Sequence, residues 1–248
     1  MKQPSTGSGL SIPVIPSHHQ QQQNHTIVPI SPTTVPPPVP QLPNLPRTDL
    51  LEGSRENYIK VGVPLYEAAM KGNWKAAKPI LDKQPDLIRF AITDNCETLL
   101  HIAATAERTK SVEEFLVNLI TLMEIEDLEL QNRNNNTALS LAAATGNVEA
   151  ARMMVEKNQN LMEMVDGNGM MPLNLAALFA EVDTMTYLYN ASKKMSGDCW
   201  SKENQGWVLQ KCVEDLAIQI VKDHPQLMDD KEIATDVLFA LARKPRAF

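Results

Sequence analysis

The stretch Thr98-Leu-Leu-His-Ile-Ala-Ala-Thr-Ala-Glu107 decides the fold, because three further stretches of the chain repeat its pattern. In each of the four stretches, a leucine is followed three residues later by Ala-Ala. The four leucines, at steps of 35, 39 and 34 residues, are Leu65, Leu100, Leu139 and Leu173. Self-similarity at a spacing of about 33 residues is typical of stacked repeat proteins, in which each unit is one supersecondary element.

The residues around each stretch predict a short helix, a turn, a longer helix and a polar loop. Gly72 and Gly146 end two of the short helices and permit the positive φ of a helix-ending turn. Glu107 and Ala180 take the place of this glycine in the second and fourth units, where we expect looser turns. Polar turn residues separate the units at residues 93–95, 132–136 and 166–169.

This pattern resembles the ankyrin repeat, whose T-P-L-H-x-A-A motif is met most fully by Thr98–Ala104. The resemblance implies an all-α fold, an ankyrin-repeat solenoid of helix-turn-helix units. The alanine pairs allow the first helices to pack closely, and Thr98 and His101 are expected to hydrogen-bond within the first turn. Tetratricopeptide units have a similar length, but they require large residues where the alanine pairs lie, and HEAT units are longer.

The repeat divides residues 58–248 into five units and a fraction. A degenerate fifth unit lacks the first-helix motif, but its second-helix residues Ala217 and Ile220 match Ala77 and Ile80. The sixth unit stops at Phe248 before any second helix, so we expect the chain to be a fragment or a truncated product. The predicted units are 58–92, 93–131, 132–165, 166–198, 201–228 (degenerate) and 229–248 (incomplete).

Residues 1–57 have a different composition and are predicted to be a disordered Pro/Gln-rich tail. They hold 11 of the 17 prolines and a run of four glutamines, and they offer too little apolar surface to offset the entropy of ordering. Four prolines fall at every third residue, which is the period of a polyproline II helix. These four prolines would line one edge of such a helix. The segment that carries them is either a ligand for a polyproline-binding partner or, as we favour, a semi-stiff linker. The four prolines are Pro37, Pro40, Pro43 and Pro46.

The net charge excludes some classes of binding partner, and the cysteines indicate the cellular compartment. The tail is neutral, so the net charge of −7 belongs to residues 58–248 and argues against nucleic acid or an anionic lipid surface as the main partner. Three cysteines without a C-x-x-C pair or a secretory signal indicate a reducing compartment. No apolar run is long enough for a membrane span. We expect a soluble protein in the cytoplasm or at the cytoplasmic face of the plasma membrane.

The sequence contains no motif that predicts catalysis, a cofactor or a metal. It has no G-x-S-x-G, H-E-x-x-H, Walker A or G-x-G-x-x-G pattern. Asp166-Gly-Asn-Gly169 begins like a calcium loop, but Ala177 stands where the acidic twelfth residue is needed. His101 belongs to the repeat motif and is expected to be structural. We therefore predict a protein that is not an enzyme.

A finer resemblance is to a plant family of ankyrin-repeat proteins whose full-length members end in a PGG-type membrane domain. It is carried by Tyr66–Trp74, Thr98–Ala106 and Ala240–Pro245, and it covers about residues 58–248. The resemblance implies further repeats and membrane spans, which this chain lacks, and a role in defence, stress or salt responses.

We therefore predict a non-catalytic scaffold or adaptor for protein–protein interaction, in plant signalling or in a stress or defence response. The alternative is the cytosolic portion of a membrane-anchored transport or signalling protein whose anchor is missing from this chain. Ankyrin stacks bind through their hairpin tips and the concave face of the first helices. By that resemblance, the candidate protein-binding residues are Asp94, Asn95, Glu97, Arg133, Asn134, Asn135, Asp166 and Asn168.

Overall fold

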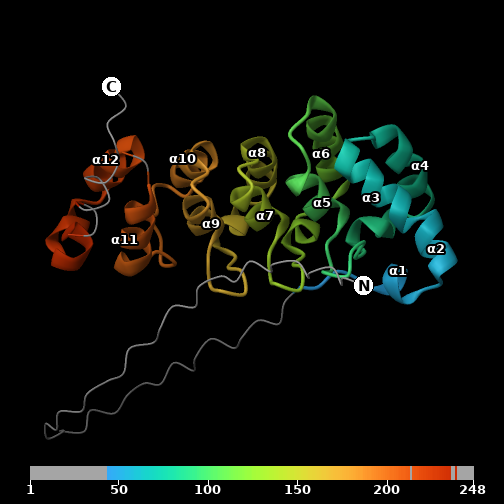
Figure 1. The fold of residues 1–248 in the computed structure, drawn as a ribbon, viewed down its shortest axis with the longest axis horizontal. Coiled ribbons are helices and arrows are strands. Elements are labelled where there is room, and N and C mark those ends of the chain that lie inside the picture. Colours follow the sequence, from blue (N-terminus) through green and yellow to red (C-terminus); the bar gives the residue numbers. More distant parts are fainter. Residues whose placement is uncertain (1–43, 213, 236–237, 239–248) are drawn as a thin grey trace, which may run out of the picture. The chain divides into compact units, whose positions relative to one another are not determined.

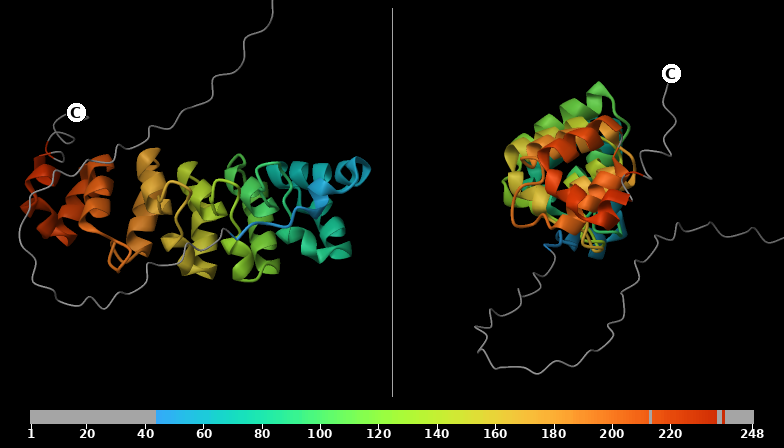
Figure 2. Two further views of the ribbon diagram at one scale, coloured as in Figure 1. Left: turned by 90° about the horizontal axis from the view of Figure 1, so that it is seen from below. Right: turned by 90° about the vertical axis from the view of Figure 1, so that its left-hand side faces the viewer.

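The structure is a computed structural model, and it describes residues 44–212, 214–235 and 238. The described residues form helices joined by turns, and they contain no β-strand beyond two isolated bridges. The first and second helices of successive units lie in two rows along the stack (Figures 1 and 2). The first four units pair α3 (Gly62–Lys71) with α4 (Trp74–Lys83), α5 (Leu99–Thr105) with α6 (Lys110–Leu122), α7 (Ala138–Ala144) with α8 (Val148–Lys157), and α9 (Pro172–Leu178) with α10 (Val182–Ala191).

Each of the second helices except α10 is followed by a short 3-10 turn that carries a buried leucine. These turns, which lead toward the loop of the next unit, are η1 (Pro85–Arg89), η2 (Glu126–Glu129), η3 (Gln159–Glu163) and η4 (Pro225–Asp229). Their leucines Leu87, Leu128, Leu161 and Leu227 are at most 3% exposed.

The residues shared by the four stretches form the core between the two rows. All eight alanines of the Ala-Ala pairs and all four motif leucines are at most 3% exposed. Burial of each leucine contributes about 1.5–3 kcal/mol, and the absence of a larger side chain at the alanines allows α3, α5, α7 and α9 to pack side by side. Trp74 packs edge-on against Phe115 at a centroid distance of 5.4 Å and joins α4 to α6. The predicted solenoid is confirmed.

The turn between the two helices of a unit is the same in the first, third and fourth units. Gly72 and Gly146 have φ values of 66° and 72°, and Ala180 adopts a φ of 58°. In each case the next residue donates its N–H to the first alanine of the pair, at 2.8–2.9 Å. The expectation of a looser fourth turn is therefore wrong, because the hydrogen bonds hold Ala180 in a left-handed conformation. The second unit does differ: Ala106 is extended and α6 begins only at Lys110.

The fifth unit contains both of its helices. We expected it to have lost its first-helix motif, yet α11 (Lys202–Lys211) forms ahead of α12 (Glu214–Asp223). The hydroxyl of Ser201 caps α11 by accepting the N–H of Asn204 at 3.2 Å, and Val208 and Leu209 bury 99% or more of their surface. Beyond it, residues 231–235 are helical. Most of the predicted incomplete sixth unit lies outside the described residues.

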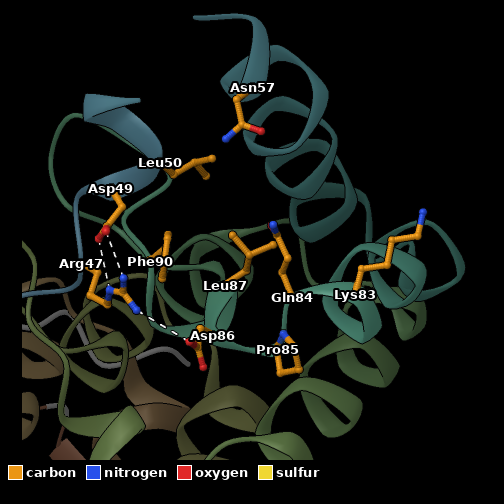
Figure 3. A pocket seen from close by; sticks show the side chains of 10 residues that line it. All are labelled: Arg47, Asp49, Leu50, Asn57, Lys83, Gln84, Pro85, Asp86, Leu87 and Phe90. Atoms are coloured by element: carbon orange, nitrogen blue, oxygen red, sulfur yellow. Dashed lines mark hydrogen bonds and ion pairs between the residues drawn. The ribbon is translucent and has the colours of Figure 1, made fainter. Parts of the chain in front are cut away.

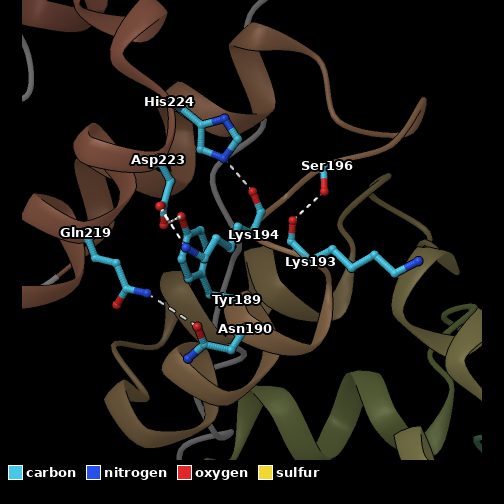
Figure 4. A network of polar contacts seen from close by, with 8 residues as sticks. All are labelled: Tyr189, Asn190, Lys193, Lys194, Ser196, Gln219, Asp223 and His224. Atoms are coloured by element: carbon cyan, nitrogen blue, oxygen red, sulfur yellow. Dashed lines mark hydrogen bonds and ion pairs between the residues drawn. The ribbon is translucent and has the colours of Figure 1, made fainter.

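A polar network joins the fourth unit to the fifth (Figure 4). The carboxylate of Asp223 accepts from the Tyr189 hydroxyl at 2.8 Å and from the Lys194 ammonium at 2.8 Å. Both hydrogen bonds lower the pKa of Asp223, while burial raises the pKa of Tyr189. The His224 ring contacts the carbonyl oxygen of Lys194. These contacts hold the loop after α10 against the end of α12.

Residues 44–57 are part of the folded body, which corrects the predicted tail boundary at residue 57. They form α1 (Asp49–Glu52) and the start of α2 (Arg55–Lys60), and Leu50 is only 2% exposed. Pro46 is also buried. The composition of this stretch resembles that of the tail, but Pro46 and Leu50 are covered by the folded body, whereas Leu45 stays 48% exposed. The rest of the predicted tail, including Pro37, Pro40 and Pro43, lies outside the described residues.

Among the described helices, none combines the length and apolar character that crossing a membrane requires.

Candidate protein-binding surface

The loops between units form hairpins that are closed by backbone hydrogen bonds. The N–H of Asn132 donates to the carbonyl of Asn136 at 2.9 Å, and the N–H of Asp166 donates to Met170 at 3.0 Å. Ile92 closes the first hairpin with Glu97 at 2.7 Å. The tips are therefore fixed by the backbone and do not depend on a partner.

Neighbouring hairpins are joined to one another as well. The N–H of Arg133 donates to the carbonyl of Asn95 at 3.0 Å, and the N–H of Gly167 donates to the carbonyl of Asn134 at 2.9 Å. Each bond links the tip of one unit to the tip of the next. The sequence prediction placed these residues at separate tips, and the structure brings them into one continuous row.

Four of the eight predicted residues use their side chains to build the hairpins: Asn95, Glu97, Asp166 and Asn168. Asp166 is 6% exposed, and its carboxylate accepts the N–H groups of Asn168 and Met170 at 2.8 and 2.9 Å. Glu97 accepts from the Thr93 hydroxyl at 2.9 Å and from the Asn95 amide at 3.1 Å. A partner that binds the row would meet the loops that these residues shape.

Four of the predicted residues present exposed side chains along the row: Asp94, Arg133, Asn134 and Asn168. Arg133 lies against Cys96, with its Nε 3.4 Å from the sulfur. Asn135 is half-buried with a φ of 56°, and its carbonyl accepts the side-chain amide of Gln131 at 2.9 Å. Its conformation makes the turn, which is a role that asparagine tolerates better than most residues.

The buried ring of His101 links its own helix to the hairpin of the next unit. Its Nδ1 accepts from the Thr98 hydroxyl at 2.8 Å and from the Thr98 N–H at 3.3 Å, so the proton lies on Nε2. Nε2 then donates to the carbonyl of Asn136 at 3.0 Å. Burial lowers the pKa of His101 to about 4, and the ring is neutral near pH 7. The expected hydrogen bonds within the first turn are confirmed, and the ring acts as a structural donor.

The stack now has the helix pairs, the closed hairpins and the motif histidine of one known repeat. A family model described as ankyrin repeats (3 copies) matches residues 65–158 and 113–198. Together these ranges span residues 65–198, which is more than half of the 248 residues. The chain belongs to the ankyrin-repeat family. Comparison with curated proteins gave no match.

This ankyrin-repeat protein also exposes apolar side chains that the sequence prediction missed. Tyr66 and Met70 of α3 are 39% and 37% exposed, and Leu178 and Phe179 at the end of α9 are 38% and 54% exposed. Met70 and Leu178 follow directly on the Ala-Ala pair of their unit, and Phe179 comes next after Leu178. Position in the motif was a usable signal, since the residues that directly follow three of the four Ala-Ala pairs are exposed: Met70, Thr105 and Leu178.

A cavity of about 520 Å³ beside the first hairpin of the ankyrin stack combines a predicted residue with a missed one. Tyr58, Val63 and Tyr66 line it, with Arg55 and Asp94 among its charged groups. The Tyr58 hydroxyl is held by the carbonyl of Ile92 at 2.8 Å, so this wall is firmly placed. Aromatic and aliphatic walls with a few charges are typical of a surface that accepts a side chain of a binding partner.

Within the described parts of the ankyrin-repeat protein, no group of three or more His, Cys, Asp or Glu side chains is placed to hold a metal ion. Asp166–Gly169, the loop that begins like a calcium site, uses the oxygens of Asp166 for its own N–H groups.

Proposed function

We propose that this protein is a non-catalytic scaffold that binds a protein partner along the row of hairpin tips. The observation that carries the proposal is the pair of backbone bonds from Arg133 to Asn95 and from Gly167 to Asn134. They fix three successive tips in one row, so their exposed side chains are presented without a cost of ordering the loops.

The chemistry of the row indicates a partner surface with both polar and apolar groups. Asp94, Arg133, Asn134 and Asn168 offer charge and amide hydrogen bonds, whereas Tyr66 and the cavity beside it offer apolar area. Tyrosine and arginine are enriched among the residues that dominate binding energy at interfaces. Tyr66 and Arg133 are therefore the side chains that we expect to contribute most.

The test compares proteins that co-purify with the full chain from the cells that produce it. A tip variant, Asn134→Lys with Asn168→Lys, adds two positive charges to exposed positions of the row. The matched control, Glu156→Lys on α8, changes the charge by the same amount on a second helix. We expect a discrete set of proteins to be lost with the tip variant and kept with the control. Equal capture by all three chains, each shown to be folded by circular dichroism, would count against the proposal.

The finer role that we propose is in plant signalling or in a stress or defence response, in the cytoplasm or at the cytoplasmic face of the plasma membrane. Its support is the resemblance of Tyr66–Trp74 and Ala240–Pro245 to the plant family. Deletion of the gene should then change tolerance to salt or to a pathogen. Unchanged tolerance to both would argue against this finer role while leaving the binding surface intact.

A further inference from the structure

The second unit is longer than its neighbours, and its second helix takes up part of the extra length. α6 has 13 residues, whereas α4, α8 and α10 have 10 each, so α6 is longer by nearly one helical turn. These second helices form the upper row in Figure 1, and the hairpins project from the lower side. Insertions in repeat proteins often lie on a binding face. The longer α6 therefore marks a surface on the side of the stack away from the hairpin tips.

The end of α6 is held firmly by the next unit. The ammonium of Lys157 on α8 donates to the carbonyl of Ile120 at 2.6 Å and also contacts the carbonyl of Met123. The side-chain amide of Asn158 donates to the carboxylate of Glu129 at 2.8 Å. These bonds satisfy carbonyls at the end of the helix and tie the chain that follows it to the third unit. The backbone of this surface is therefore fixed before any partner binds.

Aliphatic side chains nevertheless face solvent along this fixed backbone. Val117 and Leu122 of α6 are each 50% exposed, and Ile125 just beyond the helix is 48% exposed. A groove of about 440 Å³ lies beside α6, and Val117 lines it together with Met153 of α8. A single exposed apolar side chain is ordinary, but several along one edge, bordered by polar groups, are typical of an interaction site.

The charges around these aliphatic side chains have one sign. Residues 110–129 contain five glutamates and Asp127 against Lys110 alone, which gives a net charge of −5 in a chain whose total is −7. Asp127 pairs with Arg89 of η1. Four of the glutamates form no ion pair within the described parts of the chain: Glu113, Glu114, Glu124 and Glu126. The first two of these line the groove.

The cavity of about 450 Å³ between α1 and η1 is different, because its charges are balanced (Figure 3). Arg47 and Lys83 line it together with Asp49 and Asp86. The guanidinium of Arg47 donates to Asp49 at 3.0 Å, is 3.7 Å from Asp86 and lies 4.5 Å from the centre of the Phe90 ring. Such a cavity favours neither sign of charge in a partner. The uncompensated glutamates at α6, by contrast, favour a cation.

We propose that the outer surface of α6 and η2, from Lys110 to Glu129, is a second binding surface, and that its partner is a cationic amphipathic helix. The apolar face of the partner covers Val117, Leu122 and Ile125, and its flanking lysines or arginines face the glutamates. An amphipathic helix laid in a groove is a common mode of recognition. The proposal goes beyond binding at the hairpin tips, since it concerns the other side of the stack and a partner of different chemistry.

Two other occupants do not match the charge of this surface. A second copy of this chain, bound through the same surface, would bring two segments of net charge −5 together. An anionic lipid surface would meet the same repulsion. A cationic helix is the occupant that compensates the glutamates and covers the aliphatic side chains at once.

The test is a fluorescence anisotropy titration of the full chain with a labelled synthetic helix of about 18 residues, which carries leucines along one face and lysines on the other. One variant, Val117→Ser with Leu122→Ser, removes apolar area. Another, Glu114→Gln with Glu124→Gln, removes two negative charges. All four side chains are exposed, so neither variant disturbs the core. We expect the Kd for the lysine helix to rise at least about tenfold with the serine variant and at least about fivefold with the glutamine variant.

Two controls distinguish this surface from general charge attraction. The hairpin-tip variant, Asn134→Lys with Asn168→Lys, raises the net charge by the same amount as the glutamine variant, but on the opposite side of the stack. In 0.15 M salt, where charges more than about 8 Å apart are screened, it should change the Kd by less than about twofold. A helix with glutamate in place of every lysine keeps the apolar face and should not bind. Circular dichroism checks that each chain is folded.

Three results would overturn the proposal. One is the absence of saturable binding of the lysine helix to the natural chain. Another is an equal rise in Kd with the hairpin-tip variant, which would assign the binding to net charge alone. The third is a dimer of the natural chain, seen by sedimentation and abolished by the serine variant, which would assign the surface to a second copy.

Discussion

The Nε2 atom of His101 lies 3.0 Å from the carbonyl oxygen of Asn136, and this contact joins the second repeat to the hairpin of the third. The ring is 1% exposed, so a protonated form would place a charge in the core. The same ring caps its own helix through Thr98. One neutral side chain thus stabilises both a helix start and the junction between two units.

This geometry predicts a loss of stability in acid. The pKa of His101 is lowered by burial to about 4, against about 6.5 in an unfolded chain. The unfolded state therefore binds the proton more readily. The contribution of His101 is complete above about pH 7.5 and falls by about 2 kcal/mol between about pH 7.5 and about pH 5. Urea unfolding of the natural chain and of His101→Gln at both pH values measures this difference. The same pH dependence in both chains would contradict the assignment.

We expect substitution of Ala180 by glycine to stabilise the protein. Its φ of 58° costs an L-residue about 1–2 kcal/mol, whereas glycine adopts this conformation freely. After the greater entropy of glycine in the unfolded chain is subtracted, Ala180→Gly should raise the free energy of unfolding by about 0.5–1 kcal/mol. Ala144→Gly, at the last residue of α7, is the control and should lower it by about 0.5–1 kcal/mol. Destabilisation by both substitutions, measured by urea unfolding, would show that the fourth turn is not strained.

Alanine substitutions at Gly72 and Gly169 distinguish two costs to stability: that of a positive φ and that of a steric clash. Both have positive φ, at 66° and 76°. A Cβ on Gly72 would lie 2.3 Å from the backbone carbon of Ser111, whereas one on Gly169 would meet nothing within 4 Å. Gly169→Ala should therefore cost about 1–2 kcal/mol, and Gly72→Ala should cost at least about 1 kcal/mol more. Thermal unfolding of the two variants side by side decides whether the close approach of α6 matters.

We expect substitution of Asn147 to lower stability more than substitution of its counterpart in the first unit, Asn73. Both Asn73 and Asn147 cap a second helix, by accepting the N–H of Ala76 and Ala150 at 3.2 and 3.1 Å. Asn147 is also buried and donates to the carbonyl of Ala104 at 3.0 Å.

Asn73→Ala should cost about 1 kcal/mol for the lost cap, and Asn147→Ala about 2–3 kcal/mol because a buried carbonyl also loses its donor. Asn147→Asp keeps the capping oxygen and removes the donor, so its cost isolates the bond between units. Equal costs for the two alanine variants in urea unfolding would rule out that second role.

Repeat spacing and local chemistry were readable from the chain. Leu100 with Ala103 and Ala104 predicted the helix pair and its core, because a small-residue pair at a fixed distance from a leucine has few other uses. The hairpins at Asn132 and Asp166 were readable from their turn residues. By contrast, α11 was missed, since its sequence lacks the motif and its helix is stabilised by burial of Val208 and Leu209 against neighbouring units.

The candidate surface divides in the same way. The sequence by itself determined which residues lie at the hairpin tips, because turn chemistry is local and Asn134 or Asn168 needs only its own loop. Only the tertiary structure decided that Tyr66 and Phe179 are exposed and that residues 44–47 belong to the body. These outcomes depend on contacts between residues distant in sequence, such as Asn44 with Gln131, 87 positions apart. Neither the composition nor the repeat period predicts such contacts, because they form only when the units stack.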